Sequence, residues 1–182
     1  MKTHHHFLIL ILAFLSACAP PVDTDQVEKA AIEKYTSTTM ENHTALKVIA
    51  QQFYDQLSDP NNENREALSA VYMADGWVST PQPLGGPGRQ GFVNTLAAFG
   101  GMIPDLKWSV QEMLVDGNRV IVRSIASGTP NSPEGHFFGV PTKGGKKFEV
   151  PTIDIHTIED GKMVSSFHVE DWATAMQQVA GQ

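Results

Sequence analysis

The chain has 182 residues, which is enough for about one domain, and its 41% apolar and 18% charged composition is that of a folded globular protein. Thirteen Lys and Arg against twenty Asp and Glu give a net charge of −7, which argues against a nucleic-acid-binding protein. The single cysteine excludes an internal disulfide and a cysteine-based zinc cluster.

The first 18 residues have the pattern of a secretory signal peptide: a basic start, a short apolar run over 7–15 and small residues after it. Residues 15–18, Leu-Ser-Ala-Cys, resemble the bacterial lipobox, in which the cysteine becomes the lipid-modified N-terminus. We therefore predict a lipoprotein signal peptide over 1–18 with lipidation at Cys18. The residue after Cys18 is Ala19, which is not acidic. By the same resemblance, this implies sorting to the outer membrane. A plain signal peptide and a short membrane anchor remain alternatives.

Residues 19–44 are predicted to form a tether that is partly helical. They begin Ala-Pro-Pro and are otherwise rich in polar residues, while Val27, Ala30, Ala31 and Tyr35 make at most one short apolar helix face. The globular body is then expected over 45–182.

The body begins with a helical pattern. Thr44 is a plausible N-cap for a helix with apolar residues at Leu46, Ile49, Ala50, Phe53 and Leu57. Asp59-Pro60 ends this helix, and a short second helix, a strand over 76–80, a Pro/Gly loop and a third helix ending at Gly100-Gly101 follow.

From Leu106 onward the apolar period changes from helical to two. Asp116-Gly117 indicates a hairpin, and Asp160-Gly161 indicates another between strands at 148–158 and 163–170. A short amphipathic helix capped by Asp171 closes the chain. Helices followed by an antiparallel meander predict an α+β fold, a curved antiparallel β-sheet wrapped around N-terminal helices with a pocket on its concave side.

Three stretches resemble the SnoaL-like ester cyclase, or polyketide cyclase, family of the nuclear-transport-factor-2-like superfamily. They are Ile103-Pro104-Asp105-Leu106 leading to residues 116–123, Phe138-Gly139-Val140-Pro141-Thr142, and residues 153–164 with Asp171-Trp172. The resemblance implies a cone-shaped barrel with a deep, largely apolar pocket, a homodimer, and aldol-type ester cyclisation that uses no metal or cofactor.

In this family an acidic residue near the end of the last strand serves as general acid/base, beside a histidine on the preceding strand. By resemblance, His168 occupies the position of the acidic residue and Asp154 that of the histidine. The residue types look exchanged, which leaves an acid/base pair but puts the cyclase chemistry in doubt. We predict that His168 exchanges the proton and that Asp154 orients it.

The predicted pair depends on the register of the last hairpin. A two-residue loop at Asp160-Gly161 would place the two side chains on opposite faces. A three-residue loop beginning at Glu159 would pair Asp154 with Ser166, one diagonal step from His168, and we favour this loop. A further alternative is that Asp154 and His168 face solvent. Residues alternate between the two faces of a strand, so this would follow if the apolar neighbours of the pair face the core.

The remaining candidate site residues are predicted to bind ligand. His156 and Ser166 lie on the same strand faces as the pair, and Trp77, Trp108 and Phe137 are expected in the pocket wall. Asp154 and His156 lack a convincing third metal ligand, so no metal is predicted.

Three functions remain open for the body. It is either an enzyme doing cofactor-free acid/base chemistry on a small, mostly apolar, oxygenated molecule, or a non-catalytic hydrophobic-ligand-binding module of the envelope, or a structural lipoprotein that dimerises through its sheet. The expected partners are such a ligand and a second copy, with no nucleic acid and with the membrane reached only through the N-terminal lipid. The expected location is the outer membrane, facing the periplasm.

Overall fold

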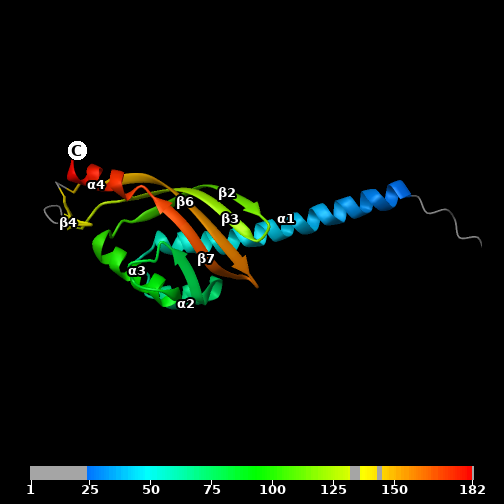
Figure 1. The fold of residues 1–182 in the computed structure, drawn as a ribbon, viewed down its shortest axis with the longest axis horizontal. Helices are drawn as coiled ribbons and strands as arrows, with labels where there is room; N and C mark the ends of the chain where they lie inside the picture. Colours follow the sequence, from blue (N-terminus) through cyan, green and yellow to red (C-terminus); the bar gives the residue numbers. More distant parts are fainter. Residues whose placement is uncertain (1–23, 132–135, 143–144, 182) are drawn as a thin grey trace, which may run out of the picture. The chain divides into compact units, whose positions relative to one another are not determined.

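The computed structural model describes residues 24–131, 136–142 and 145–181, so the predicted signal peptide and Cys18 lie outside the described residues. The chain divides into two units, residues 1–37 and 38–182. Its helices are α1 (Thr24–Leu57), α2 (Arg65–Tyr72), α3 (Gly88–Met102) and α4 (Trp172–Ala180) (Figure 1). Its strands are β1 (Met73–Thr80), β2 (Lys107–Asp116), β3 (Arg119–Gly128), β4 (His136–Phe137), β5 (Val140–Pro141), β6 (Phe148–Glu159) and β7 (Lys162–Glu170).

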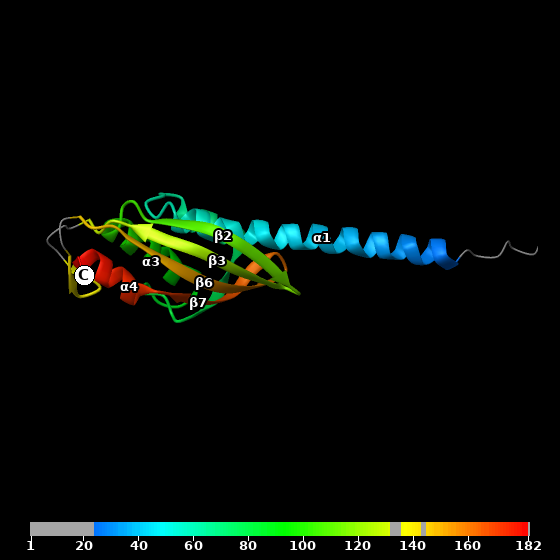
Figure 2. The same ribbon diagram turned by 90° about the horizontal axis from the view of Figure 1, so that it is seen from above.

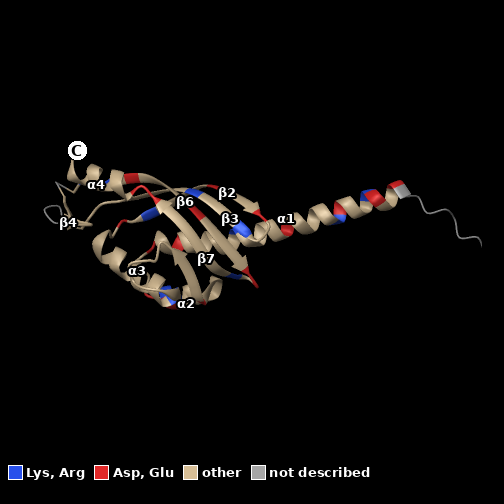
Figure 3. Ribbon diagram, in the orientation of Figure 1, with Lys and Arg blue, Asp and Glu red and all other residues tan. Residues whose placement is uncertain are grey.

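Helix α1 begins twenty residues earlier than the predicted cap at Thr44. The Thr44 hydroxyl instead donates to the carbonyl of Met40 at 2.9 Å, which is a bond made inside a continuing helix. The part of the predicted tether from Thr24 onward is therefore helical. Its first turns carry charges of both signs (Figure 3), and no helix in the described part of the chain has the length and apolarity to cross a membrane.

The five-stranded sheet has the order β1-β7-β6-β3-β2 (Figures 1 and 2). The three pairings from β2 to β7 are antiparallel, as predicted, whereas β1 runs parallel to β7. The sheet is therefore mixed rather than antiparallel throughout. Strands β4 and β5 form a separate two-stranded sheet.

One hydrophobic core lies between the end of α1, helices α3 and α4, and the inner face of the sheet. Close packing explains one glycine of α3: a Cβ on Gly91 would lie 1.9 Å from the backbone oxygen of Gly86, so only glycine fits there. Asp171 caps α4 as predicted, because its side chain accepts a hydrogen bond from the Thr174 backbone at 3.0 Å.

Over residues 152–156 and 166–170, the inner face of the last two strands is polar and the outer face is apolar, the reverse of the usual arrangement. Asp154 is 3% exposed, whereas Ile153, Phe167 and Val169 are 43%, 50% and 57% exposed. The alternative in which Asp154 faces solvent is therefore wrong. Alternation separates the two faces but does not indicate which one is buried.

The β6–β7 hairpin turns on two residues, not on the predicted three. Asp160 and Gly161 both have positive φ, 48° and 74°, and Glu159 pairs with Lys162 across them. A bulge then shifts the register, because Ile158 pairs with Met163 but Thr157 pairs with Ser165, so Val164 is the extra residue. The bulge restores even-to-even pairing and sets Asp154 directly opposite His168.

Candidate active site

A cavity of about 280 Å³ opens within the unit of residues 38–182. Its wall is mainly aromatic and aliphatic, with a small polar part. The lining residues are Phe53, Leu57, Trp77, Ser79, Pro81, Gln82, Pro83, Leu84, Phe92, Thr95, Phe99, Trp108, Phe138, Asp154, His168, Glu170, Trp172 and Met176. This combination of an apolar wall and a few grouped polar side chains is typical of a small-molecule site.

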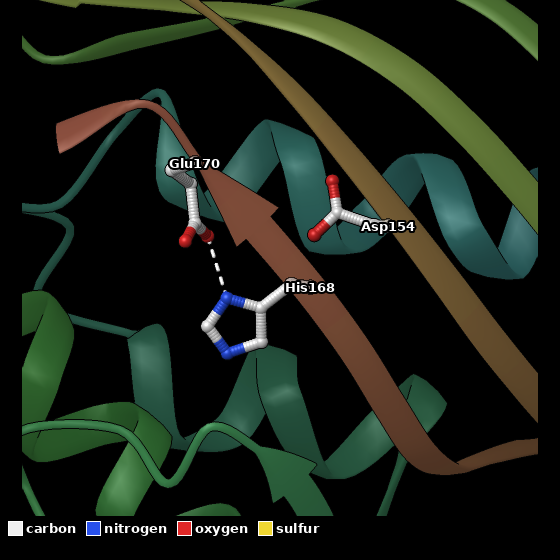
Figure 4. Close-up of side chains that lie close together, drawn as sticks. All are labelled: Asp154, His168 and Glu170. Atoms are coloured by element: carbon white, nitrogen blue, oxygen red, sulfur yellow. Dashed lines mark hydrogen bonds and ion pairs between the residues drawn. The ribbon is translucent and has the colours of Figure 1, made fainter. Parts of the chain in front are cut away.

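The polar part comes from two adjacent strands. Figure 4 shows Asp154 projecting from β6 and His168 and Glu170 projecting from β7, on the same side of the sheet. The two β7 residues share a face because they are two positions apart on the strand. One oxygen or nitrogen atom from each of the three side chains lies within 4.8 Å of the others.

Both nitrogens of His168 have oxygen partners. Nδ1 lies 2.6 Å from Oε1 of Glu170, and Nε2 lies 3.0 Å from both the Pro81 carbonyl and the Ser79 hydroxyl. A carbonyl oxygen only accepts, so Nε2 carries a hydrogen, and the Glu170 carboxylate favours a second hydrogen on Nδ1.

These contacts decide the charge of the ring. Burial by itself lowers the pKa of His168, but the hydrogen bond and charge of Glu170, with smaller help from Pro81 and Asp154, raise it above the ordinary value. The two acceptors that face the ring nitrogens and the raised pKa both favour the imidazolium form of His168.

Asp154, the third titratable group of the site, has an incomplete set of hydrogen-bond partners. Its Oδ2 atom is buried and has no hydrogen-bond partner among the described residues. Burial raises the pKa of Asp154 to about 7; the Tyr54 hydroxyl and the His168 charge oppose this shift, and the charge of Glu170 adds to it. Near neutral pH the carboxyl group is therefore present both as an acid and as a base.

Sequence reasoning missed Glu170. Asp154 was expected to orient His168, and the register does set the two residues opposite each other, but the hydrogen bond to the ring comes from Glu170. Its spacing of two from His168 on a predicted strand was the available signal, because residues i and i+2 share a face.

The predicted binding residues divide into two groups. Trp77 and Trp108 line the cavity, with their indole N–H groups turned to Ser166 and Thr152. His156, Ser166 and Phe137 do not line it. Phe137 is fully buried, with its ring 5.4 Å from that of Phe148.

His156 and Ser166 belong to a buried hydrogen-bonded chain behind the cavity wall. The Trp77 indole donates to Ser166 at 3.0 Å, Ser166 contacts Nδ1 of His156 at 2.8 Å, and Nε2 of His156 contacts the Tyr54 hydroxyl at 2.8 Å. Burial lowers the pKa of His156 to about 3, helped by the charge of His168, so the ring is neutral. Of the members of this hydrogen-bonded chain, only Trp77 lines the cavity, and the others support the wall from behind.

The same three carboxylate and imidazole groups also have the donor types of a metal site. A metal ion bound to Nδ1 of His168 would have to replace the hydrogen bond between that atom and Glu170. The geometry is that of an imidazole hydrogen-bonded to one carboxylate and set opposite a second carboxyl group.

Residues 48–179 match the family model described as SnoaL-like polyketide cyclase. This chain belongs to the SnoaL-like polyketide cyclase family. The resemblance noted in the sequence is thereby confirmed, and the SnoaL-like part covers nearly all of the unit that holds the cavity. None of the curated proteins matches the chain significantly.

Solved structures agree on the SnoaL-like fold. A candidate polyketide cyclase from Bacillus cereus is 26% identical, with a TM-score of 0.60 over 75% of this chain and 80% of that one. TsrD from Streptomyces laurentii is 19% identical, with a TM-score of 0.64 over 76% and 97%. IdmH, a candidate polyketide cyclase from Streptomyces antibioticus, is 21% identical, with a TM-score of 0.59 over 73% and 96%.

Proposed function

We propose that this SnoaL-like protein binds a small, mostly apolar, oxygenated molecule and moves a proton within it without a cofactor. The observation that carries the proposal is the buried carboxyl of Asp154, set across from His168 at the polar end of an apolar cavity. A carboxyl group with a pKa of about 7 is both available as a base and strong enough as an acid at neutral pH.

The roles in this proposal differ from those predicted from the sequence. His168 already carries hydrogens on both nitrogens, so it is a poor base, and Asp154 is the group that accepts the proton. The C–H bond next to a ligand carbonyl breaks, its proton goes to Asp154, and its electron pair moves to the carbonyl oxygen. Asp154 then returns the proton to another atom of the ligand, which completes an isomerisation. Alternatively, the enolate carbon bonds to a second carbonyl carbon, and the oxygen of that carbonyl takes the proton from Asp154. The His168 charge favours the negative species that forms.

The role of Asp154 as a base can be tested with a model reaction that does not require the natural substrate. The Kemp elimination of 5-nitrobenzisoxazole needs only a carboxylate in an apolar site, so we expect the protein to accelerate it with a rate that rises with pH through about 7. Asp154→Asn should lower the rate by about a hundredfold or more. Asp116→Asn, at the exposed end of β2, is the matched control and should leave the rate unchanged.

Two results would contradict the proposal: an Asp154→Asn rate equal to that of the parent protein, or loss of the rate after chelator treatment. The second result would assign the three clustered side chains to a metal ion instead.

The alternative function is a non-catalytic hydrophobic-ligand-binding module of the cell envelope. The observation that favours it is that the N–H groups of His168 are already bonded within the protein, which leaves little to activate a ligand carbonyl. Nile red, a neutral apolar dye, distinguishes the two functions. A binding module binds the dye and shows no Kemp elimination, whereas the proposed enzyme shows both.

We also propose that the protein is an exported lipoprotein anchored through Cys18, with its body in the periplasm beside the outer membrane. The support is the signal-peptide pattern over residues 1–18 and the lipobox-like residues that end it. Labelled palmitate should be incorporated by the full-length protein in a bacterial host and not by Cys18→Ser. Labelling of both proteins, or recovery of the parent protein in the soluble fraction, would contradict the anchor.

A further inference from the structure

The cavity wall is made largely of aromatic rings, which fall into two groups. Phe53, Trp77 and Phe92 form one, with ring centroids 4.9 Å apart for Phe53–Phe92 and 5.8 Å apart for Trp77–Phe92. Trp172 is the centre of the other, 6.3 Å from Phe99, 6.2 Å from Trp108 and 5.3 Å from Phe138. Aromatic faces carry partial negative charge and attract cations.

The hydrogen-bond donors of this wall are mostly committed elsewhere. The indole N–H groups of Trp77 and Trp108 donate to Ser166 and Thr152, outside the cavity lining. Both His168 nitrogens face protein oxygens. Lys and Arg do not occur among the lining residues of the described chain. The wall therefore offers acceptors in excess of donors, which is unfavourable for a ligand that carries a carboxylate or a phosphate.

The charges of the polar end are also unbalanced. The His168 cation is shared with Glu170, 2.6 Å away, so it only partly offsets the charge of Asp154, whose Oδ2 has no hydrogen-bond partner among the described residues. The other ionisable group facing it, the Tyr54 hydroxyl, is neutral because burial, with the charge of Asp154, raises the pKa of Tyr54. A cation in the cavity would supply the missing counter-charge and allow Asp154 to ionise.

We propose that the ligand of this cavity is an apolar molecule that carries a protonated amine. The inference rests on the proposed function, since it names the chemical class that the same cavity accepts. The aromatic rings take the apolar frame and attract the positive charge, and the carboxyl of Asp154 accepts a hydrogen bond from the ammonium group.

Three ligands with one skeleton test the charge preference. They are 2-naphthylmethylamine, 2-naphthylmethanol and 2-naphthoic acid, a cation, a neutral donor and an anion at pH 7.5. In calorimetric titrations of the full-length protein in detergent, we expect the amine to bind at least about tenfold more tightly than the alcohol. The acid should bind more weakly than either. Equal affinities of amine and alcohol would overturn the inference.

Two variants locate the preference in the cavity. Asp154→Asn should lower the affinity for the amine to that for the alcohol. It should change the affinity for the alcohol by less than about twofold. Phe138→Leu replaces a partly exposed ring, so this variant should fold normally. It should weaken binding of the amine more than binding of the alcohol. A preference for the amine that survives both variants would place its cause outside this cavity and would also overturn the inference.

The outcomes separate this inference from the proposed function. If the alcohol binds as well as the amine and Asp154-dependent Kemp elimination is present, the charge preference is wrong and the acid/base site stands. If the amine is preferred but no elimination occurs, the ligand class stands and the catalytic proposal is wrong. If none of the three compounds binds, the ligand class is wrong, and the Kemp elimination decides the proposed function separately.

Discussion

Glu170 and His168 form a 2.6 Å contact between Oε1 and Nδ1 from two positions of the same strand, β7. The contact is largely shielded, since the two side chains are only 10% and 21% exposed. It raises the pKa of His168 and so favours the cationic imidazole, while the pKa of Asp154, about 7, lies near neutral pH. Glu170 therefore controls the site through His168.

Glu170→Gln should lower the pKa of His168, because the carboxylate is the main group that raises it. The stability that comes from this raised pKa is present below the unfolded value of 6.5 and is lost as the pH rises through the folded value. The variant should therefore lose stability mainly at pH 5 to 6. Imidazole proton resonances followed by NMR give the titration, with the exposed Glu149→Gln as control. An unshifted His168 curve would show that the contact is absent in solution.

Asp154→Asn should stabilise the protein at alkaline pH. The pKa of Asp154 rises from 3.8 to about 7 on folding, so folding favours the protonated form and the parent protein loses stability as the pH increases between these values. The full loss is on the order of 4 kcal/mol as an upper limit. Urea unfolding at pH 5 and pH 8 measures it. The gap between variant and parent should be larger at pH 8, and a gap independent of pH would contradict the raised pKa.

Tyr54→Phe should destabilise the protein while leaving the cavity in place. The substitution leaves Nε2 of the fully buried His156 without its 2.8 Å partner, and an unsatisfied buried polar group costs about 1–3 kcal/mol. Chemical denaturation measures the change, and Nile red binding checks that the cavity persists. A variant as stable as the parent protein would show that the buried chain contributes little.

The homodimer implied by the family resemblance is a further prediction. The outer face of the sheet exposes Ile153, Phe167 and Val169, an apolar surface suited to a second copy. Light scattering of the detergent-solubilised protein should give a dimer, and Phe167→Glu should shift it to monomer. A monomer at all concentrations tested would contradict the prediction, while a dimer unaffected by Phe167→Glu would place the interface elsewhere.

Local patterns predicted most of the elements of the body. The hairpin at Asp116-Gly117, the cap at Asp171 and the change from helical to strand period were all confirmed, because each depends on residues a few positions apart. The start of the first helix was not. Threonine is a common N-cap residue, but nothing in the neighbours of Thr44 forces the helix to begin there.

The sequence by itself determined that a carboxyl and an imidazole would stand on the last two strands of an α+β, SnoaL-like body. Tertiary structure decided which face of those strands is buried, since alternation is symmetric between the faces. Packing against the end of α1, where Phe53 and Tyr54 contact His156, selects one. It also decided the register, because the extra residue Val164 lies within a strand and has no local signature. The exchange of roles between His168 and Asp154 follows from that packing, because the partners of each group come from distant parts of the chain.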